Sequence, residues 1–146
     1  MADPSSMERR IDELLVSAGP LAEGNAPALL HGDYWPGNSM WREEKLVAVI
    51  DWEDAELGDP LIDLARSRAE IVWIFGVEAM ELFTREYQSL MAVDYNNLPY
   101  WDLCAVLRVL RIAGGNLAGL ASYFAAYGRL DINAESIKEN LEVLLR

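Results

Sequence analysis

The sequence predicts an α+β domain that is mostly helical and carries one small β-hairpin. Hydrophobic residues make up 52% of the 146 residues and charged residues 25%, a balance typical of one globular domain with its own core. Apolar residues recur at helical spacing before residue 20 and again after residue 60. Between these regions, two short apolar runs flank a polar turn, which is the pattern of a hairpin.

The first helix is expected directly after residue 6, because Ile11, Leu14, Leu15 and Ala18 fall on one face. Gly19-Pro20 ends it, and residues 21–27 form a linker.

The hairpin is expected between residues 39 and 50. Ser39–Arg42 and Leu46–Ile50 are its strands, and Glu43-Glu44-Lys45 is a three-residue turn. With the turn centred near Glu44, Asn38 falls opposite Ile50 and Asp51.

The remainder of the chain is predicted to be helical. Asp59 and Pro60 are typical of an N-cap followed by proline at the first helical position, and they open a helix through about Phe75. Further helical segments follow at about 77–92, 99–127 and 134–146. The Gly114-Gly115 pair interrupts the longest of these and favours close packing or a kink there.

Charge and cysteine content exclude several classes. Twelve basic against 24 acidic residues give a net charge of −12, which disfavours nucleic acid and anionic membranes as partners. The acidity suits a cationic small molecule, although it also serves solubility alone. One cysteine excludes an intrachain disulfide. With no signal-like N-terminus and no long apolar run, the expected compartment is the cytoplasm.

Three oxygen-bearing side chains converge at the open end of the hairpin. Asn38 and Asp51 end its two strands, and Asp33 precedes Asn38 in a loop that can fold back over the same end. Two carboxylates and an amide oxygen suit Mg²⁺. A structural zinc site is excluded, because the chain has one histidine and one cysteine. Phosphoryl transfer needs this set: a carboxylate that takes the proton of the attacking hydroxyl, and an Asn and an Asp that hold the metal.

Three motifs in register carry a resemblance to a known family. His31-Gly32-Asp33-Tyr34-Trp35-Pro36-Gly37-Asn38 resembles the catalytic loop of the aminoglycoside phosphotransferase and choline kinase family, which is related to the protein kinases. Ile50-Asp51-Trp52-Glu53 is similar to its metal-binding segment. Gly58-Asp59-Pro60-Leu61-Ile62-Asp63-Leu64-Ala65 is similar to the helix start that follows. Fructosamine kinases share a similar loop, but the second and third motifs look closer to the aminoglycoside type.

The resemblance implies a protein-kinase-like C-terminal lobe that spans residues 1–146 and uses ATP and Mg²⁺. It makes Asp33 the catalytic base and Asn38 and Asp51 the metal ligands. His31 is expected to support the loop through hydrogen bonds rather than to react.

Other residues near these motifs have two interpretations. Glu53 lies two residues after Asp51 and, in an extended segment, points the same way, toward a second metal or a cationic substrate; a solvated acid is the alternative. Trp35 and Trp52 could stack on a substrate ring, although packing is the commoner use of tryptophan. Asp59, as an N-cap, and Asp63, as a tie from the helix to the loop, are assigned to structural support.

The nucleotide-binding half of such a kinase is not expected in this chain. No glycine-rich phosphate loop occurs, and the only lysines, Lys45 and Lys138, are not on a strand in the required context. The isolated chain is therefore expected to be inactive or nearly so, with the N-terminal lobe supplied in cis or in trans.

Two other functions are kept as alternatives: a non-catalytic binding or regulatory module that binds a cationic ligand, and a metal-dependent hydrolase. The substrate is a small hydroxyl compound, for which an aminoglycoside, choline, homoserine and a sugar all stay open. An apolar face exposed near the hairpin would favour a homodimer.

Overall fold

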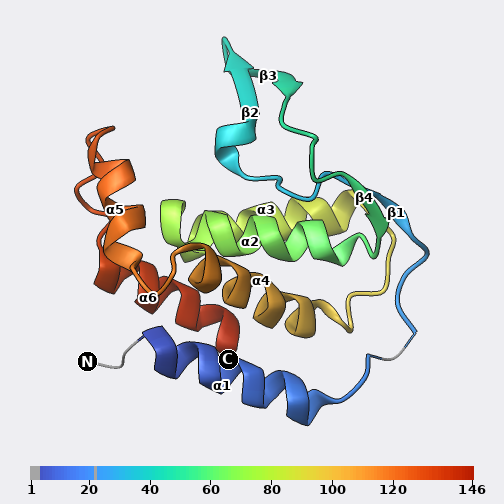
Figure 1. Ribbon diagram of the computed structural model, residues 1–146. Coiled ribbons are helices and arrows are strands. Elements are labelled where there is room, and N and C mark those ends of the chain that lie inside the picture. The colour runs from blue at the N-terminus through green and yellow to red at the C-terminus, as the bar shows by residue number, and fades with distance from the viewer. Residues whose placement is uncertain (1–3, 22) are drawn as a thin grey trace.

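The computed structural model describes residues 4–21 and 23–146, and it has the mostly helical α+β architecture predicted above (Figure 1). The helices, in chain order, are α1 (Pro4–Ala18), α2 (Leu61–Phe75), α3 (Val77–Leu90), α4 (Leu98–Ile112), α5 (Leu117–Ala125) and α6 (Ala134–Glu142). The strands are β1 (Ala28–Leu30), β2 (Ser39–Arg42), β3 (Lys45–Val49) and β4 (Glu56–Gly58). Single 3₁₀ turns cover Pro36–Asn38 and Val143–Leu145.

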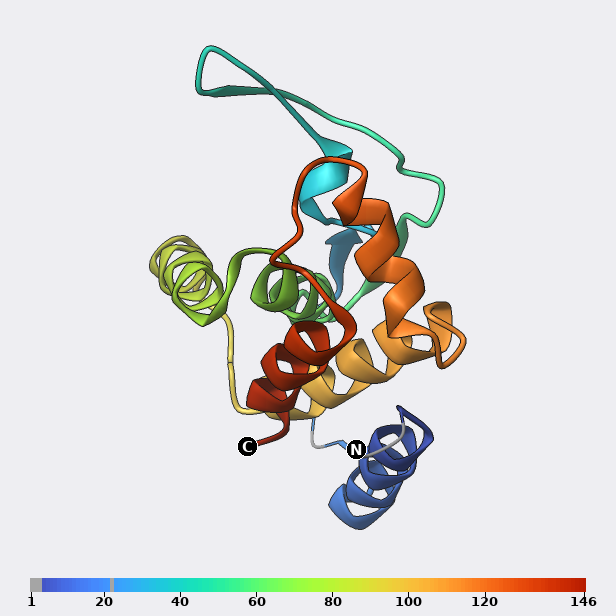
Figure 2. The ribbon, with the colours of Figure 1, turned by 90° about the vertical axis from the view of Figure 1, so that its left-hand side faces the viewer.

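Helix α2 is the centre of the helical body and packs against α3, α4 and α6 (Figure 2). Its apolar side chains are closed off from water together with residues of α1, α4 and α6. The most deeply buried include Ile11, Leu61, Leu64, Val72, Val106, Leu110, Ile137 and Leu141. Each such side chain stabilises the fold by roughly 1.5–3 kcal/mol relative to an exposed one, so this core holds α2 against its neighbours.

A buried ion pair ties α2 to its two neighbours. The Arg68 guanidinium donates to both carboxylate oxygens of Asp102 on α4, at 2.9 and 3.0 Å, and to Thr84 Oγ1 on α3. Because both groups are taken out of water, removing either one would leave the other charge uncompensated.

The β-hairpin projects from the helical body (Figure 1). β2 pairs with β3 in antiparallel register, with a bulge between Met40 and Trp41. The expected three-residue turn is wrong by one residue: Arg42 pairs with Lys45, so Glu43 and Glu44 alone form the turn, both at positive φ. Two residues at positive φ give the turn whose twist matches that of the flanking strands.

A second antiparallel pair, β1 with β4, joins the segments on either side of the hairpin. Leu29 lies opposite Leu57, and Ala28 opposite Gly58. Each strand has three residues, which is too short to show a strand periodicity, and the sequence therefore did not reveal this pair.

The predicted helix over 99–127 is two helices, which is a correction of the sequence interpretation. Gly114 and Gly115 both have positive φ, and α4 and α5 meet there at 79°. A kink at this glycine pair was one of the two expectations. Smaller corrections concern the ends: α2 begins at Leu61 with Pro60 in the cap position, and α6 ends at Glu142 before a 3₁₀ turn.

Within the described part of the chain, no single helix is long and apolar enough to span a membrane; only the bent pair of α4 and α5 meets the criteria of length and composition together.

Candidate active site

Side chains from the first two turns of α2 fix the loop between β1 and β2. Asp63 accepts hydrogen bonds from the backbone N–H groups of His31, at 2.5 Å, and Gly32, at 3.0 Å. Arg66 donates to the carbonyl of Gly32 at 2.7 Å, and Ser67 donates to that of Tyr34 at 2.9 Å. Four polar groups of the loop backbone are thereby satisfied without regular secondary structure.

Asp59 determines how the chain enters α2. Its carboxylate accepts a hydrogen bond from the N–H of Leu61 at 3.0 Å, which satisfies a donor of the first helical turn. The same carboxylate binds the backbone N–H and side-chain amide of Asn25 at 3.2 and 3.1 Å. The carboxylate oxygens of Asp59 and Asp63 therefore accept hydrogen bonds from the protein itself, as expected for residues that support the structure.

Gly32 allows the loop to contact the turn that follows Asp51. Its φ is +85°, and a Cβ at this position would lie 2.2 Å from the carbonyl oxygen of Asp54. No other residue fits this position without moving the backbone.

His31 is buried, and both of its ring nitrogens are engaged. Nδ1 accepts a hydrogen bond from the N–H of Asp33 at 3.2 Å, so Nε2 carries the proton that it donates to the carbonyl of Ile50 at 2.8 Å. The histidine links the loop to the end of β3, and neither nitrogen is available to a substrate.

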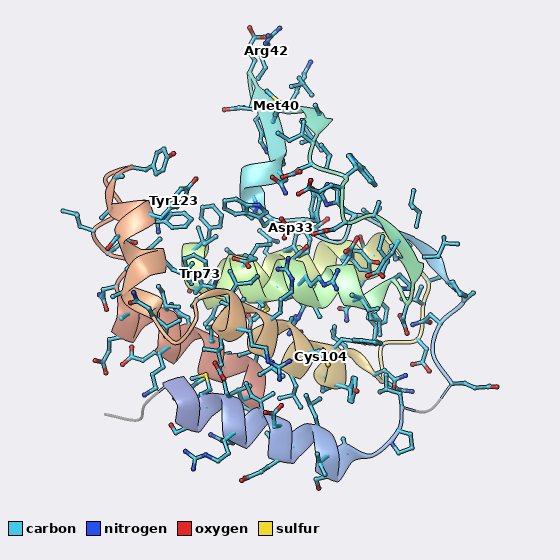
Figure 3. The ribbon with its side chains drawn as sticks, viewed as in Figure 1. Asp33, Met40, Arg42, Trp73, Cys104 and Tyr123 are labelled. Carbon is cyan, nitrogen blue, oxygen red and sulfur yellow. The ribbon has the colours of Figure 1, made fainter. Side chains whose placement is uncertain are left out.

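Asp33 lies at the base of the hairpin, above α2 (Figure 3). Its Oδ1 is 2.8 Å from Nη2 of Arg108 on α4, and both side chains are about one-third exposed. The side-chain amide of Asn38 donates to the backbone carbonyl of Asp33 at 2.9 Å and to its Oδ2 at 3.3 Å. Both carboxylate oxygens are thus oriented by fixed donors.

Arg108 is the site residue whose role the sequence did not reveal. A pairing with some carboxylate could be suspected, but 75 residues separate it from Asp33. No spacing rule connects them, because the contact depends on how α4 is rotated against α2.

Asn38 and Asp51 lie at neighbouring ends of the hairpin strands, as the predicted register requires. The N–H of Ile50 donates to the carbonyl of Asn38 at 2.9 Å, which continues the β2–β3 pairing. Asp51 follows at φ +67° and is exposed, and its side chain makes no hydrogen bond or ion pair with the described residues.

The oxygen ligands at the strand ends, the amide oxygen of Asn38 and the carboxylate of Asp51, fit a hard cation that a phosphate also binds. Asn38 uses its amide N–H group toward Asp33, which leaves its oxygen for a metal, and the Asp51 carboxylate is unpaired within the described ranges. No group of three or more His, Cys, Asp or Glu side chains among these residues could hold a metal by itself. Mg²⁺ commonly binds through one or two protein oxygens together with substrate phosphates and water.

The segment after Asp51 is not extended, which corrects the argument made for Glu53. Residues 53 and 54 form a turn, in which the N–H of Ala55 donates to the carbonyl of Trp52 at 3.1 Å. Glu53 is exposed and has no hydrogen-bond or ion-pair partner in the described chain, so the period-2 argument that aligned it with Asp51 does not apply.

Trp35 and Trp52 have different environments. Trp35 is partly buried against the core, with its ring over Gly37, and it borders a pocket of about 280 Å³ with Trp41 and Phe75. The Trp52 side chain is half exposed, with its ring 4.5 Å from that of His31, and it borders an apolar pocket of about 400 Å³. Packing therefore accounts for Trp35 better than for Trp52.

Glu70, one turn after Arg66 on α2, has an unusual acidity. Burial raises the pKa of its carboxyl from 4.5 to about 7, while nearby Arg108 lowers it and Asp33 raises it further. An acid that titrates near neutral pH therefore lies beside the Asp33–Arg108 pair.

The mostly helical α+β fold, with a carboxylate, an amide and an arginine at the base of the hairpin, belongs to the class of phosphotransferases. The chain belongs to the phosphotransferase enzyme family, whose model matches residues 4–101. The family resemblance of the three sequence motifs is therefore confirmed.

Two solved structures show the same fold. An apo thermostable mutant of aminoglycoside phosphotransferase APH(4)-Ia superimposes with a TM-score of 0.58 and 22% identity, covering 100% of this chain and 45% of that one. Amicoumacin kinase hAmiN, in complex with AMP-PNP, Ca²⁺ and Ami, gives a TM-score of 0.56 and 16% identity, covering 97% of this chain and 46% of that kinase. The chain thus spans about half the length of these kinases.

Curated relatives include acyl-CoA dehydrogenase family member 11 from Rattus norvegicus, 29% identical over 107 residues, and from Homo sapiens, 27% identical over 106 residues. Each match covers 62% of this chain and 14% of the relative. The chain therefore corresponds to a small part of those proteins.

Proposed function

We propose that this chain is the catalytic C-terminal lobe of a small-molecule phosphotransferase that uses ATP and Mg²⁺. One observation carries the proposal: the Asp33 carboxylate is fixed between Arg108 and Asn38, at the strand ends where Asn38 and Asp51 offer oxygen ligands. A kinase of the same fold, whose structure was solved with AMP-PNP and Ca²⁺, supports the proposal of a nucleotide and a divalent cation here.

In the proposed reaction, Asp33 orients the substrate hydroxyl and accepts its proton as the oxygen attacks the γ-phosphate of ATP. Arg108 holds the base in place through Oδ1. Asn38 and Asp51 would hold Mg²⁺, which when bound supplies charge neutralisation to the phosphates. His31 and Asp63 keep the loop backbone in the geometry that these roles need.

Activity is proposed to require a nucleotide lobe, in cis or in trans. Lys45 begins β3 at the hairpin turn, and Lys138 pairs with Glu142 on α6, so neither is placed to bind ATP phosphates.

The hairpin also exposes several large apolar side chains, namely Met40, Trp41, Leu46, Val47 and Ile50. A nucleotide lobe, or a second copy of this chain, would bury these side chains by packing against the hairpin. Sedimentation equilibrium tests the second copy, since a concentration-independent mass of 16.4 kDa would exclude the homodimer.

The substrate is proposed to be a small hydroxyl compound. Antibiotic kinases share the fold, and the acidic rim near the site, including the exposed Glu53 and Asp54, is the basis for testing cationic compounds such as aminoglycosides and choline. The name of the curated relatives adds hydroxylated acyl-CoA thioesters to the panel.

The test is transfer of labelled phosphate from ATP to this panel, with the longest native protein that contains the chain. Asp33→Asn should abolish transfer while leaving the circular dichroism spectrum unchanged, because the amide cannot accept the proton. Arg111→Gln is the matched control, because Arg111 is exposed on α4 and its guanidinium forms an ion pair with Asp12 at 3.5 Å. Transfer that survives in Asp33→Asn would exclude Asp33 as the base.

The alternative is a non-catalytic module that binds a cationic ligand. It would be favoured if Mg²⁺ and ATP gave no phosphate transfer or release with the native protein while a cationic ligand raised its Tm. Release of phosphate without any acceptor would instead favour the metal-dependent hydrolase.

A further inference from the structure

A small pocket lies between α2 and α4, next to the candidate active site. Its volume is about 140 Å³. The residues that line it are Ile62, Arg66, Trp101, Cys104, Ala105 and Arg108. Two of the chain's twelve basic residues therefore border one pocket in a protein whose net charge is −12.

The two arginines are only partly neutralised. Arg66 is 2.7 Å from the uncharged carbonyl of Gly32, and its nearest carboxylate, exposed Glu56, is 3.8 Å away. At that distance and exposure the pair is worth little. Arg108 pairs through one nitrogen with Asp33. The pocket therefore has two guanidinium groups and one close carboxylate.

Hydrogen-bond donors remain available on this lining. Each guanidinium has five N–H groups, and within the described residues most of those on Arg66 and Arg108 have no partner. Glu70, the other acid close to Arg108, has its pKa raised to about 7 by burial, so it carries less than a full negative charge at neutral pH.

We propose that this pocket is a subsite for an anionic group, a carboxylate or a phosphate, on the hydroxyl substrate. Guanidinium groups bind both anions through paired hydrogen bonds. The volume is several times the ~30 Å³ that one water occupies in the liquid, which suffices for such a group.

The position of the pocket relates this subsite to the proposed reaction, on which the inference rests. Arg108 contacts Asp33 and also lines the pocket. A substrate whose anion is bound there therefore has its neighbouring atoms close to the proposed base. Holding a hydroxyl in such a position is a large part of what this kind of catalysis requires.

Cys104 provides a direct test, because it is the only cysteine of the chain. It lies on α4 (Figure 3) and lines the pocket in a partly exposed position. Neutral iodoacetamide alkylates this thiol, and intact mass spectrometry measures the rate. The rate is compared in sodium phosphate, sodium acetate and sodium chloride of equal ionic strength. Since burial raises the pKa of the Cys104 thiol, all rates are compared at one pH.

Phosphate, acetate or both should slow alkylation about threefold at a concentration of about twice the dissociation constant, and chloride should not. Protection by phosphate alone assigns a phosphate group, and protection by both assigns small oxyanions including carboxylates. Equal rates in all three salts would overturn the proposal. Protection by ATP with Mg²⁺ as strong as that by phosphate would assign the pocket to the donor and also overturn it.

The variants test which side chains bind the anion. Arg108→Gln and Arg66→Gln should lose the protection, while Arg111→Gln should keep it, because Arg111 lies outside the pocket. Should either pocket variant fail to fold, the comparison of salts on the unmodified chain still decides the matter. The readout needs no phosphoryl transfer, so its failure is distinct from a failure of the proposed kinase function.

Discussion

At the scale of single residues, the candidate site depends on side chains that hold backbone as much as on those that would do chemistry. Asp63 receives two backbone N–H groups of the loop, and His31 connects that loop to β3. The sequence analysis assigns Asp63 to structural support, as a tie from the helix to the loop. The sequence could not show which N–H groups it would accept.

Replacing Asp63 by Ala should lower the free energy of unfolding by about 2–3 kcal/mol, because it leaves two partly buried N–H groups without their charged acceptor. Urea unfolding measures the change. The control is Asp131→Ala, whose carboxylate is about two-thirds exposed and pairs with Arg129, and whose cost should be clearly smaller because solvent screens that pair. Equal costs for the two variants would contradict the role given to Asp63.

Glu70 should make the stability depend on pH. Its folded pKa, about 7, is above the ordinary 4.5, so the folded chain holds this proton to higher pH than the unfolded chain does. The free energy of unfolding should therefore fall as pH rises from about 4.5 to 7, by at most about 3 kcal/mol, and stay level above that range.

Glu70→Gln should lack this fall and should be more stable than the unmodified chain at pH 8. Urea unfolding at several pH values from 4.5 to 8 measures it, with exposed Glu139→Gln as the control. A Glu70→Gln profile parallel to that of the unmodified chain would show that burial does not perturb this carboxyl.

At the scale of elements, the bend between α4 and α5 depends on the glycine pair. Gly114 and Gly115 have φ of +56° and +76°, and no atom lies near enough to hinder a Cβ at either position. The cost of a substitution is therefore conformational. Gly115→Ala should destabilise the protein by about 1–2 kcal/mol.

Gly119→Ala is the matched control for the bend. Gly119 lies within α5, and a Cβ there would make only ordinary contacts with Asn116, at 3.5 Å or more. It should stabilise by up to about 1 kcal/mol, through helix propensity. Thermal unfolding compares the two variants, and a stabilising Gly115→Ala would show that the bend needs no left-handed residue.

Strong local patterns explain which elements could be predicted. The hairpin and the start of α2 depend on neighbours in sequence, so they were predicted to within a residue or two. The β1–β4 pair was not predicted, because each strand has only three residues and the whole hairpin separates the two strands in the sequence. The break after α4 was visible as two glycines, but their φ angles are set by where α5 packs.

At the scale of the whole molecule, the candidate site combines segments that are distant in the chain. The loop and the hairpin bring Asp33, Asn38 and Asp51 to one end, and this convergence followed from hairpin register. The arginines come from α2 and α4, and their arrival at the same place depends on helix packing. Hairpin register and the family resemblance therefore predicted the proposed metal ligands and base, whereas the proposed anion-binding residues could be found only in the structure.

The central claim is that this end of the hairpin is a divalent-cation site for phosphoryl transfer. Titrating Mn²⁺, which takes the same oxygen ligands as Mg²⁺, into the ¹⁵N-labelled chain tests it without a nucleotide lobe. Signals of Asn38 and Asp51 should broaden first. The effect should disappear in Asp51→Asn and persist in Glu43→Gln, which changes an exposed acid at the hairpin turn. Broadening spread evenly over the acidic surface, or unchanged in Asp51→Asn, would contradict the account.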